Sequence, residues 1–563
     1  MKKTNRRIIA TVLSVAIMGS IISGCQSTQQ TKKASTEGGN SSNIANTASA
    51  DYDYKNFKAS KPETFTMLYN NMSAYPYKAD WLFWKKLKEK TNVSLKLTVV
   101  DSADYNDKRS VLIAAGNAPE IMPKSYAGSE DKFVTSGQLL PISDYANNAY
   151  MPNFCSEVKT WGIQSDVDQL KQRDGKIYCW PELHQSINTD YSLVVRTDLL
   201  KKNNIEMPES ESWNDIETIL KQFKKLYPNV IPWSDNYKMD STLGFAGPAF
   251  GTGAAGEWSS GNSLYYDKKS DKFVFTPTMS QYKDMLIYFN RLVNEGLLDK
   301  SSLTQSSDKA EEKFINGKSF MMAANSQEVV QLRTKMDGTI GKGKYEIKKI
   351  NVPSGPAGSY ITASHLENGI MISSKAKNDP NFKDLMHFVD WLYFSYNGQE
   401  FCKWGVEGQT FTKENDTYKL TSDWKLPAYN KMSSNPKAKD LRQNAGFGNG
   451  VFILSYGGPD ALAKSCMSQE DIDFNTMVNK THKVLENAPK YYYDEDTQEQ
   501  QNLLNSTLTD YYISMTDRFI LGQASITKDW NSYVTGLNNK GMQKYVDTAN
   551  EAYQNTKSGK TQD

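Results

Sequence analysis

Three glycines, Gly251, Gly253 and Gly256, have the spacing G-x-G-x-x-G, which can bind the pyrophosphate of a dinucleotide at the start of a helix. That chemistry needs a strand before the glycines and a helix after them. Here no clear strand leads in, and the following residues EWSSG do not start a helix. We therefore expect a flexible loop. The chain also lacks G-x-S-x-G, H-E-x-x-H and P-loop lysine motifs, so we expect no enzymatic activity of these types and no cofactor.

Cys25 is the second candidate for chemistry. It follows a basic start at residues 1–7, an apolar run at residues 8–22, and the small residues Ser23 and Gly24. This order is typical of an export signal, and the run is too short for a spanning helix. The apolar-Ser-Gly-Cys ending resembles the bacterial lipobox, in which the cysteine thiol receives a diacylglyceryl group. We predict a lipoprotein signal peptide at residues 1–24, lipidation of Cys25, and attachment to the outer face of the cytoplasmic membrane. A plain secretory signal with a chance cysteine is the alternative.

Residues 26–50 contain no aromatic side chain and one large aliphatic residue, Ile44. Such a segment buries too little apolar area to offset its chain entropy. We therefore predict that residues 25–58 form a disordered tether behind the lipid, and that the folded body begins near residue 59.

The length of 563 residues exceeds what one compact core holds, so two lobes are expected. The net charge of +2 includes four basic residues of the signal, which leaves a slightly acidic mature chain. Nucleic acid needs a basic surface, so we expect no such partner. The remaining cysteines, Cys155, Cys179, Cys402 and Cys466, are scattered without metal-ligand spacing. The 32 Tyr, 11 Trp and 22 Phe fit a large core, and some of them fit binding of a polar, non-ionic ligand.

Hydrophobic periodicity predicts a strand at 63–69, a helix at 79–91 and a strand at 93–99. A strand, a helix and a strand within forty residues form a βαβ unit, which favours a parallel sheet and an α/β fold. Further helices are predicted at 213–227, 281–294 and 382–396, the first with a Ser212–Asp215 capping box. A short apolar strand is predicted at 369–374.

Several segments resemble one family. They are TNVSLKLTVVDSADYNDKRSVLIAAGNAPEIM at 91–122, VVRTDLLKKNNIEMPESESWNDIETILKQFKK at 194–225, YYDKKSDKFVFTPTMSQYKDMLIYFNRLVNEGLLDK at 265–300, FINGKSFMM at 314–322, FVDWLYFSYNGQEFCKWGVEGQTFT at 388–412 and FILGQASITKDWNSYVTGL at 519–537. In this order they are similar to the carbohydrate-type extracellular solute-binding proteins of ABC importers, especially the long lipoprotein branch of Gram-positive bacteria.

The resemblance implies a type II periplasmic-binding-protein-like fold, with two α/β lobes, hinge strands and a ligand cleft between the lobes. By analogy, lobe one is expected at 59–190 and 346–400, and lobe two at 191–345 and 401–563. The crossings are expected near Asn188–Tyr191 and Gly341–Tyr345. Many relatives carry a calcium loop after the helix that here ends at Tyr227. The segment PNVIPWSDN has too few carboxylates at ligand spacing, so we expect no metal there.

Ligand-binding residues in an open α/β lobe belong in the loops after strand ends. Polar and aromatic residues at such positions, and near the crossings, are the candidates. They are Asn70, Asn71, Tyr75, Ser125, Tyr126, Trp180, Glu182, His184, Trp233, Asp235, Glu367, Asn368, Trp404 and Glu407. For each ring a core position is the alternative, and for each acid a solvated surface position.

The leading hypothesis is a monomeric, lipid-anchored receptor that captures an oligosaccharide and delivers it to the permease of an ABC transporter, without altering it. The second hypothesis is a surface enzyme that degrades polysaccharide with a pair of carboxylates. The third is a receptor of the same fold for a peptide or another small solute. The sequence leaves the identity of the ligand open.

Overall fold

The computed structural model describes residues 53–73, 75–126, 128–208, 211–253, 263–415, 417–429, 431–452 and 457–559. The predicted signal, Cys25 and most of the predicted tether lie outside these ranges. Of the glycine motif, Gly251 and Gly253 are described: they follow a helix rather than a strand, and both have positive φ. This agrees with a loop and not with a dinucleotide turn.

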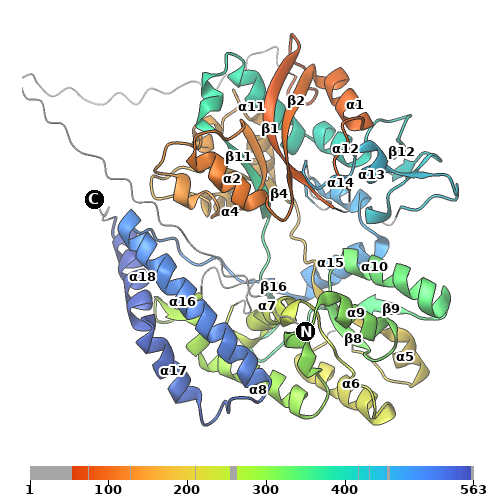
Figure 1. Ribbon diagram of the computed structural model, residues 1–563, viewed down its shortest axis with the longest axis vertical. Helices are drawn as coiled ribbons and strands as arrows, with labels where there is room; N and C mark the ends of the chain where they lie inside the picture. The colour runs from red at the N-terminus through yellow and green to blue at the C-terminus, as the bar shows by residue number, and fades with distance from the viewer. Residues whose placement is uncertain are drawn as a thin grey trace, which may run out of the picture. The chain divides into compact units, whose positions relative to one another are not determined.

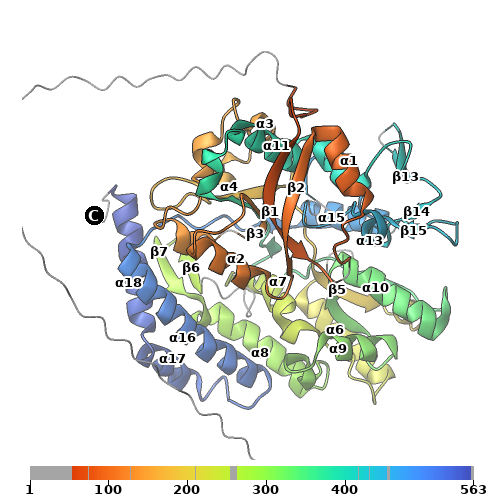
Figure 2. The same cartoon turned by 45° about the horizontal axis from the view of Figure 1, so that its top comes forward.

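The described residues form an α/β structure with two lobes, each around its own sheet. The lobe-one sheet has five strands in the order β2-β1-β3-β11-β4. They are β1 (Glu63–Asn71), β2 (Val93–Asp101), β3 (Ile121–Ser125), β4 (Cys179–Leu183) and β11 (Leu366–Ile372). β1 pairs in parallel with β2 and β3, as the βαβ pattern predicts, and the two long strands lie side by side in Figure 2. β11 runs antiparallel between β3 and β4.

Helices cover the lobe-one sheet because their apolar faces pack on it. They are α1 (Leu82–Thr91), α2 (Tyr105–Ala114), α3 (Pro152–Trp161), α4 (Gln164–Asp168), α11 (Phe382–Phe394), α12 (Tyr396–Trp404), α13 (Leu441–Ala445) and α14 (Asp460–Ser465). Short strand pairs lie beyond α12: β12 (Phe411–Glu414) with β13 (Thr417–Leu420), and β14 (Trp424–Lys425) with β15 (Lys439–Asp440). Trp180, Trp391 and Trp404 are fully buried in this core.

The lobe-two sheet is smaller and antiparallel, in the order β8-β5-β9. Its strands are β5 (Ser192–Arg196), β8 (Met321–Ala324) and β9 (Ile347–Lys349). Most of the lobe is helical: α5 (Thr197–Lys202), α6 (Trp213–Leu226), α7 (Asp240–Phe250), α8 (Ser280–Asn294), α9 (Ser307–Ile315), α10 (Ser326–Met336), α15 (Gln469–Thr481), α16 (Glu495–Ile520), α17 (Trp530–Asn539) and α18 (Met542–Lys557). The predicted capping box of α6 is present. A hairpin, β6 (Leu264–Asp267) with β7 (Lys272–Phe275), packs on α18, and Figure 1 shows α8, α16, α17 and α18 together.

Among the described residues, the chain passes between the lobes in three segments. The first, residues 184–191, joins β4 to β5 and agrees with the crossing expected near Asn188–Tyr191. The second, residues 362–365, follows β10 (Tyr360–Ile361), which pairs with β16 (Lys483–Val484). The third lies between Cys466, in the lobe-one core, and α15, whose Phe474 is in the lobe-two core.

The lobe boundaries therefore differ from the predicted ones. β9 hydrogen-bonds to β5, which assigns residues 347–352 to lobe two rather than to lobe one. The helix α12 and most of residues 405–466 pack in the lobe-one core, although 401–563 were expected in lobe two. The glycine-rich segment Gly341–Tyr345 is not a crossing, because it connects the end of a π-helical turn to β9 on the edge of the lobe-two sheet.

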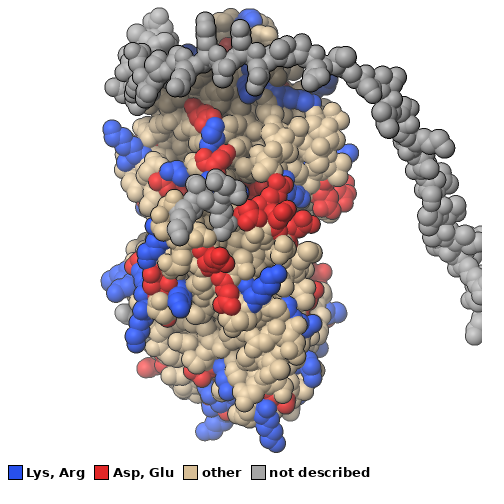
Figure 3. All heavy atoms as spheres, turned by 90° about the vertical axis from the view of Figure 1, so that its left-hand side faces the viewer, with Lys and Arg blue, Asp and Glu red and all other residues tan. Residues whose placement is uncertain are grey.

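Basic and acidic side chains are interspersed on the face drawn in Figure 3, and the basic ones form no continuous patch there. Within the described ranges, every helix falls short of the length and apolar character that a membrane span requires. The cysteines Cys179, Cys402 and Cys466 are buried as free thiols, and Cys155 is half-buried.

Candidate functional site

Polar residues from four strands meet at one edge of the lobe-one sheet. The parallel strands β1 and β3 end there, and because β11 is antiparallel, it begins there. The register places Gly369 opposite Ser125 and Leu366 opposite Leu183, so the start of β11 lies between the ends of β3 and β4. We call this the lobe-one edge: Asn70, Lys124, Tyr126, Glu182, Glu367 and Asn368.

A small cavity opens at the lobe-one edge. Lys124, Glu182 and Asn368 contribute its polar lining, and Gly450 and Phe452 contribute part of its opposite wall. The amide oxygen of Asn70 is buried without a hydrogen-bond partner, and the Asn368 side chain acts on the neighbouring Glu367 carboxyl. An unpaired buried polar group is costly unless a ligand or water pairs with it, so Asn70 favours a binding role for this edge.

The charges at the lobe-one edge act on one another. Burial lowers the pKa of Lys124, and Glu182 and Glu367 partly restore it. Burial raises the pKa of the Glu367 carboxyl, while Lys124 lowers it. Partial burial and the charges of Glu367 and Glu182 raise the pKa of Tyr126. This residue is nevertheless 53% exposed. The edge thus offers an ammonium donor, two carboxylates and an exposed ring within mutual reach.

Backbone strain supports a functional role for Lys124. Its φ is 54°, in the left-handed region that residues with a Cβ rarely adopt. The buried Arg109 holds this turn, since its guanidinium donates to the Lys124 carbonyl at 2.8 Å. Strained residues of this kind persist where the surroundings fix them, and they concentrate at functional sites. Lys124 was not among the residues predicted from the sequence, because it is a strand residue and not part of the loop after the strand.

Tyr75 lies beside this edge. Its side chain is buried, and the Arg442 guanidinium stands over the ring at 4.3 Å. A Cβ built on Gly450, which lines the cavity, would lie 3.3 Å from the Tyr75 hydroxyl and 3.8 Å from Lys124 Nζ. Tyr75 thus contacts the wall of the cavity, and its ring is already covered by a cation.

The remaining predicted site residues lie elsewhere or serve the fold. Trp180, Trp233 and Trp404 are fully buried in the two cores, where other rings cover them. Asp235 is buried and accepts from the Thr242 hydroxyl at 2.6 Å and from the Ala323 amide at 2.7 Å. These four positions do not contribute to the lobe-one edge. The three tryptophan rings fill the cores of the two lobes, and the Asp235 carboxylate is occupied by hydrogen bonds within lobe two.

Four further candidates also have local roles. Asn71 bridges Asp101 and the Tyr77 amide, and Ser125 donates to the Met122 carbonyl. His184 is buried, and its backbone exchanges hydrogen bonds with His365. Glu407 is exposed in the turn before β12. Along the chain, Asn71 and Ser125 are directly next to residues of the lobe-one edge, and His184 lies two residues after Glu182.

A second cavity lies at the first two crossings. Its lining comes from three segments: the first crossing (Asn188, Thr189, Asp190 and Tyr191), the helix α7 (Asp240, Ser241, Gly244 and Phe245), and the start of the second crossing (Ile361 and Thr362). The hydroxyl oxygens of Ser241 and Thr189 are buried without partners. Ser241 lies in the first turn of α7, where backbone N–H groups are free to bind acceptors. We call this the crossing cavity.

The turn that leads into α7 is strained. Tyr237, Lys238 and Met239 have φ values of 48°, 51° and 66°, and none is a glycine. Tyr237 donates to the Glu328 carboxylate, which also accepts from the Asn325 amide at 2.8 Å. The Asn325 side chain in turn donates to the Tyr191 hydroxyl at 3.1 Å. These bonds hold the turn in place, and Tyr237, Asp240, Ser241 and Glu328 were not predicted from the sequence.

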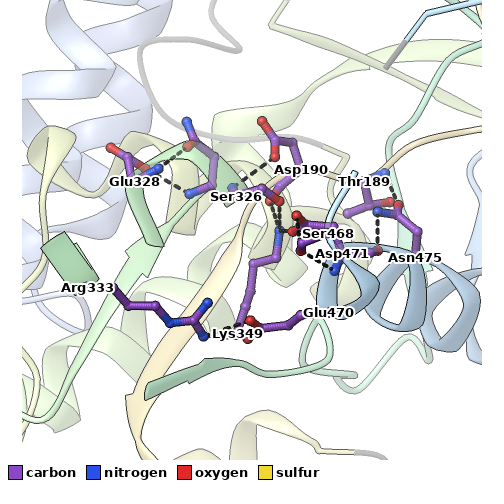
Figure 4. A network of polar contacts seen from close by, with 11 residues as sticks. Thr189, Asp190, Ser326, Glu328, Arg333, Lys349, Ser468, Glu470, Asp471 and Asn475 are labelled. Atoms are coloured by element: carbon purple, nitrogen blue, oxygen red, sulfur yellow. Dashed lines mark hydrogen bonds and ion pairs between the residues drawn. The ribbon is translucent and has the colours of Figure 1, made fainter. Parts of the chain in front are cut away.

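A polar network fixes the first crossing to lobe two (Figure 4). Lys349 is 2% exposed in its side chain, and its Nζ donates to the Asp190 carbonyl at 2.8 Å and to the Ser326 hydroxyl at 2.7 Å. The Ser326 amide donates to the Asp190 carboxylate at 3.1 Å, and the Thr189 amide to Asn475 of α15 at 2.8 Å. Burial lowers the pKa of Lys349, while Asp190 and Asp471 raise it. Both the backbone and the side chains of the first crossing are therefore hydrogen-bonded to lobe two.

Among the residues that the structure describes, no group of three His, Cys, Asp or Glu side chains is arranged to hold a metal ion. In the segment PNVIPWSDN, Asp235 is committed to Thr242 and Ala323.

Comparisons with known proteins agree with this architecture. Lipoprotein LipO of Bacillus subtilis (strain 168) is 24% identical over 344 residues, which is 58% of this chain and 63% of the relative. The polygalacturonan/rhamnogalacturonan-binding protein YtcQ of the same organism is 24% identical over 338 residues, which is 59% of this chain and 64% of the relative. Both alignments thus span less than two thirds of the relative.

Solved structures show the same fold. The alginate-binding protein AlgQ2, crystallised without calcium ion, superposes with a TM-score of 0.65 at 18% identity, over 89% of this chain and 99% of the other. An HMO-binding, ABC-transporter-associated solute-binding protein from Bifidobacterium longum infantis gives 0.64 at 18% identity, over 88% and 99%. Residues 70–395 match the sequence pattern of one family over more than half of the chain, so this protein belongs to the bacterial extracellular solute-binding proteins.

Proposed function

We propose that this protein is a lipid-anchored receptor that binds an oligosaccharide between its lobes and delivers it to an ABC transporter. The observation that carries the proposal is the lobe-one edge, where Lys124, Glu182 and Asn368 line one cavity from three strands and Glu367 lies beside it. Family membership and the names of the relatives support a soluble sugar as the ligand.

The chemistry of the edge suits sugar hydroxyls. Carboxylates accept two hydroxyl protons, and an ammonium or amide nitrogen donates to hydroxyl oxygens; such charge-assisted bonds are the strong ones. The exposed ring of Tyr126 offers an apolar face for sugar C–H groups. A micromolar complex needs about 8 kcal/mol, which a few such bonds and one or two rings can supply.

The crossing cavity offers a second set of groups on lobe two, namely Asp240, Ser241 and Tyr191. A ligand that touches both sets favours the arrangement in which the lobes approach each other. A permease that recognises this arrangement would distinguish loaded from empty receptor. The receptor itself performs no bond cleavage in this proposal.

Isothermal titration of the full chain against a panel of mono- and oligosaccharides tests the binding function. We expect at least one oligosaccharide to bind with micromolar or better affinity, and chromatography after incubation to recover it intact. The double variant Glu182→Gln/Asn368→Ala should weaken that binding, whereas Glu414→Gln, an exposed acid on β12, should not. Cleaved products would support an enzyme, and a null panel would exclude a sugar receptor.

Membrane attachment is tested separately. Mass spectrometry of the protein from bacterial membranes should find a diacylglyceryl group on Cys25, and Cys25→Ser should shift the protein into the medium. Delivery is tested by uptake of the identified sugar in cells that carry or lack this gene. Loss of anchoring without loss of sugar binding would show that the two properties are independent.

A further inference from the structure

The charged groups around the two cavities are mostly acidic. Glu182 lines the lobe-one cavity and Glu367 stands beside it, while Asp190 and Asp240 line the crossing cavity. Glu328 lies next to the crossing cavity through Tyr237 and Tyr191, whose ring centroids are 6.5 Å apart. Glu367 lies beside the lobe-one cavity without lining it, and Asp190 of the crossing cavity still acts on its carboxyl, so the acids near the two cavities are within electrostatic reach of each other.

The cations near these acids are already committed. Lys349 is buried and bound to the Asp190 carbonyl and the Ser326 hydroxyl, and it lies 3.9 Å from Asp471. Arg333 pairs with Glu470 at 2.7 Å. Lys349 acts first on Asp190 and offsets part of its charge from behind the crossing, whereas neither Lys349 nor Arg333 lines a cavity.

At the lobe-one edge the cations are similarly engaged. Arg109 is buried and donates to a backbone carbonyl, and Arg442 covers the ring of Tyr75. Among the described residues that line the two cavities, Lys124 is the one basic side chain, and it stands between Glu182 and Glu367. A ligand carboxylate placed there would compete with two protein carboxylates for a single ammonium group.

A uronate differs from its neutral sugar by one carboxylate in place of a hydroxymethyl group. Like charges brought together during binding cost several kcal/mol unless a cation pairs with them. Sugar hydroxyl groups are instead favoured by the protein acids, because each carboxylate can accept hydrogen bonds from two hydroxyl groups. The composition of the cavities therefore discriminates by charge and not only by shape.

We infer that the site selects oligosaccharides without carboxylate groups and disfavours uronate oligomers, because the acids of both cavities outnumber the single lining cation. This inference rests on the proposed sugar-binding function. It also separates this chain from the relative whose name includes polygalacturonan, a polymer of uronate.

Matched pairs of ligands test the inference. Oligomers of galactose and galacturonate, mannose and mannuronate, or glucose and glucuronate, equal in length and linkage, are titrated into the full chain. In every pair with a measurable affinity, we expect the neutral member to bind at least tenfold more tightly, which is about 1.4 kcal/mol. High salt should narrow the difference, because it screens the repulsion of the uronate and leaves the neutral ligand unaffected.

Two variants sharpen the test. Glu367→Gln removes one charge at constant shape and should bring the uronate closer to its neutral partner by about threefold or more. Lys124→Met removes the lone cation and should widen the difference. Glu414→Gln is the control for a surface charge remote from both cavities. Tighter binding of the uronate in any pair would overturn the charge selection and leave the receptor function intact. Binding of neither member in any pair would overturn the receptor function itself.

Discussion

The two lobes provide polar groups for a ligand by different structural means. In lobe one the groups stand at the ends of regular strands, and strand register determines which of them are neighbours. In lobe two they stand at the start of α7, behind three successive residues with positive φ, and hydrogen bonds to Glu328 hold that turn. Strained backbone occurs at one residue of the lobe-one edge, Lys124, and at three successive residues of lobe two, so the sheet mainly organises lobe one, whereas lobe two relies on side chains that offset the strain.

The largest expected effects on stability come from replacing a glycine that packs against backbone in each lobe. A Cβ on Gly369 of β11 would lie 1.5 Å from the Trp180 carbonyl, and one on Gly355 of lobe two would lie 2.5 Å from the Ala249 carbonyl. We expect Gly369→Ala to lower the free energy of unfolding by about 3 to 5 kcal/mol, and Gly355→Ala by less. Urea unfolding measures both. Gly338→Ala, which meets no atom within 4 Å, is the control, and a smaller loss for Gly369→Ala than for Gly355→Ala would contradict the comparison.

Next in size are two buried carboxylates, one in each lobe. Asp390 accepts from the Asn153 and Phe154 amides, each at 3.0 Å, and Asp235 accepts from Thr242 and Ala323. Replacing either by Ala leaves buried donors unpaired, so each variant should lose about 2 to 4 kcal/mol of stability. Calorimetry measures the loss. If only one variant is destabilised, the prediction that a buried carboxylate stabilises each lobe to a similar extent is wrong.

Binding should depend more on lobe one than on lobe two. Asn368→Ala removes an amide that lines the lobe-one cavity, and Ser241→Ala removes an unpaired hydroxyl from the crossing cavity. We expect about tenfold weaker binding, or 1.4 kcal/mol, for Asn368→Ala and about threefold for Ser241→Ala. Titration with the sugar identified in the panel measures both. Equal losses would show that both lobes contribute alike.

The smallest expected effect is a pH dependence of stability. Burial raises the pKa of Glu130 in lobe one and of Glu211 in lobe two from 4.5 to about 7. The folded state therefore keeps these protons up to near neutral pH, whereas the unfolded chain releases them above 4.5.

Their contribution to stability is full below pH 4.5 and is lost as pH rises through about 7. Each carboxyl should contribute a decline of about 1 kcal/mol between pH 6 and 8. Denaturant midpoints across that range measure the decline. Glu130→Gln and Glu211→Gln should each flatten the curve, and a curve that both variants leave unchanged would contradict the assignment.

The contrast between the lobes also explains what the sequence could predict. The role of Tyr126, Glu182, Glu367 and Asn368 in ligand binding stays a prediction, but the structure does bring these four residues to the lobe-one edge. The sequence pattern selected them because they lie next to a strand end or near the first crossing. It missed Lys124, since positive φ at the last residues of a strand leaves no mark in the sequence. The tryptophans were selected for their sugar-stacking chemistry, yet Trp180, Trp233 and Trp404 fill the cores.

Lobe two was harder to predict for a physical reason. The turn Tyr237–Met239 contains no glycine or proline, so the local sequence does not indicate its positive φ values. Its conformation depends on Glu328 and Asn325, about ninety residues further along the chain. The family resemblance suggested a crossing near Gly341–Tyr345, but strand pairing of β9 keeps that segment within one lobe.

The number of connections between the lobes has a mechanical consequence. Two neighbouring connections allow the lobes both to bend and to twist, whereas the third, between Cys466 and α15, opposes twisting. Relative motion is then reduced toward a single bending coordinate. If the protein acts as proposed, a ligand that draws the lobes together would cost the protein little orientational entropy, so more of the contact energy would remain as affinity.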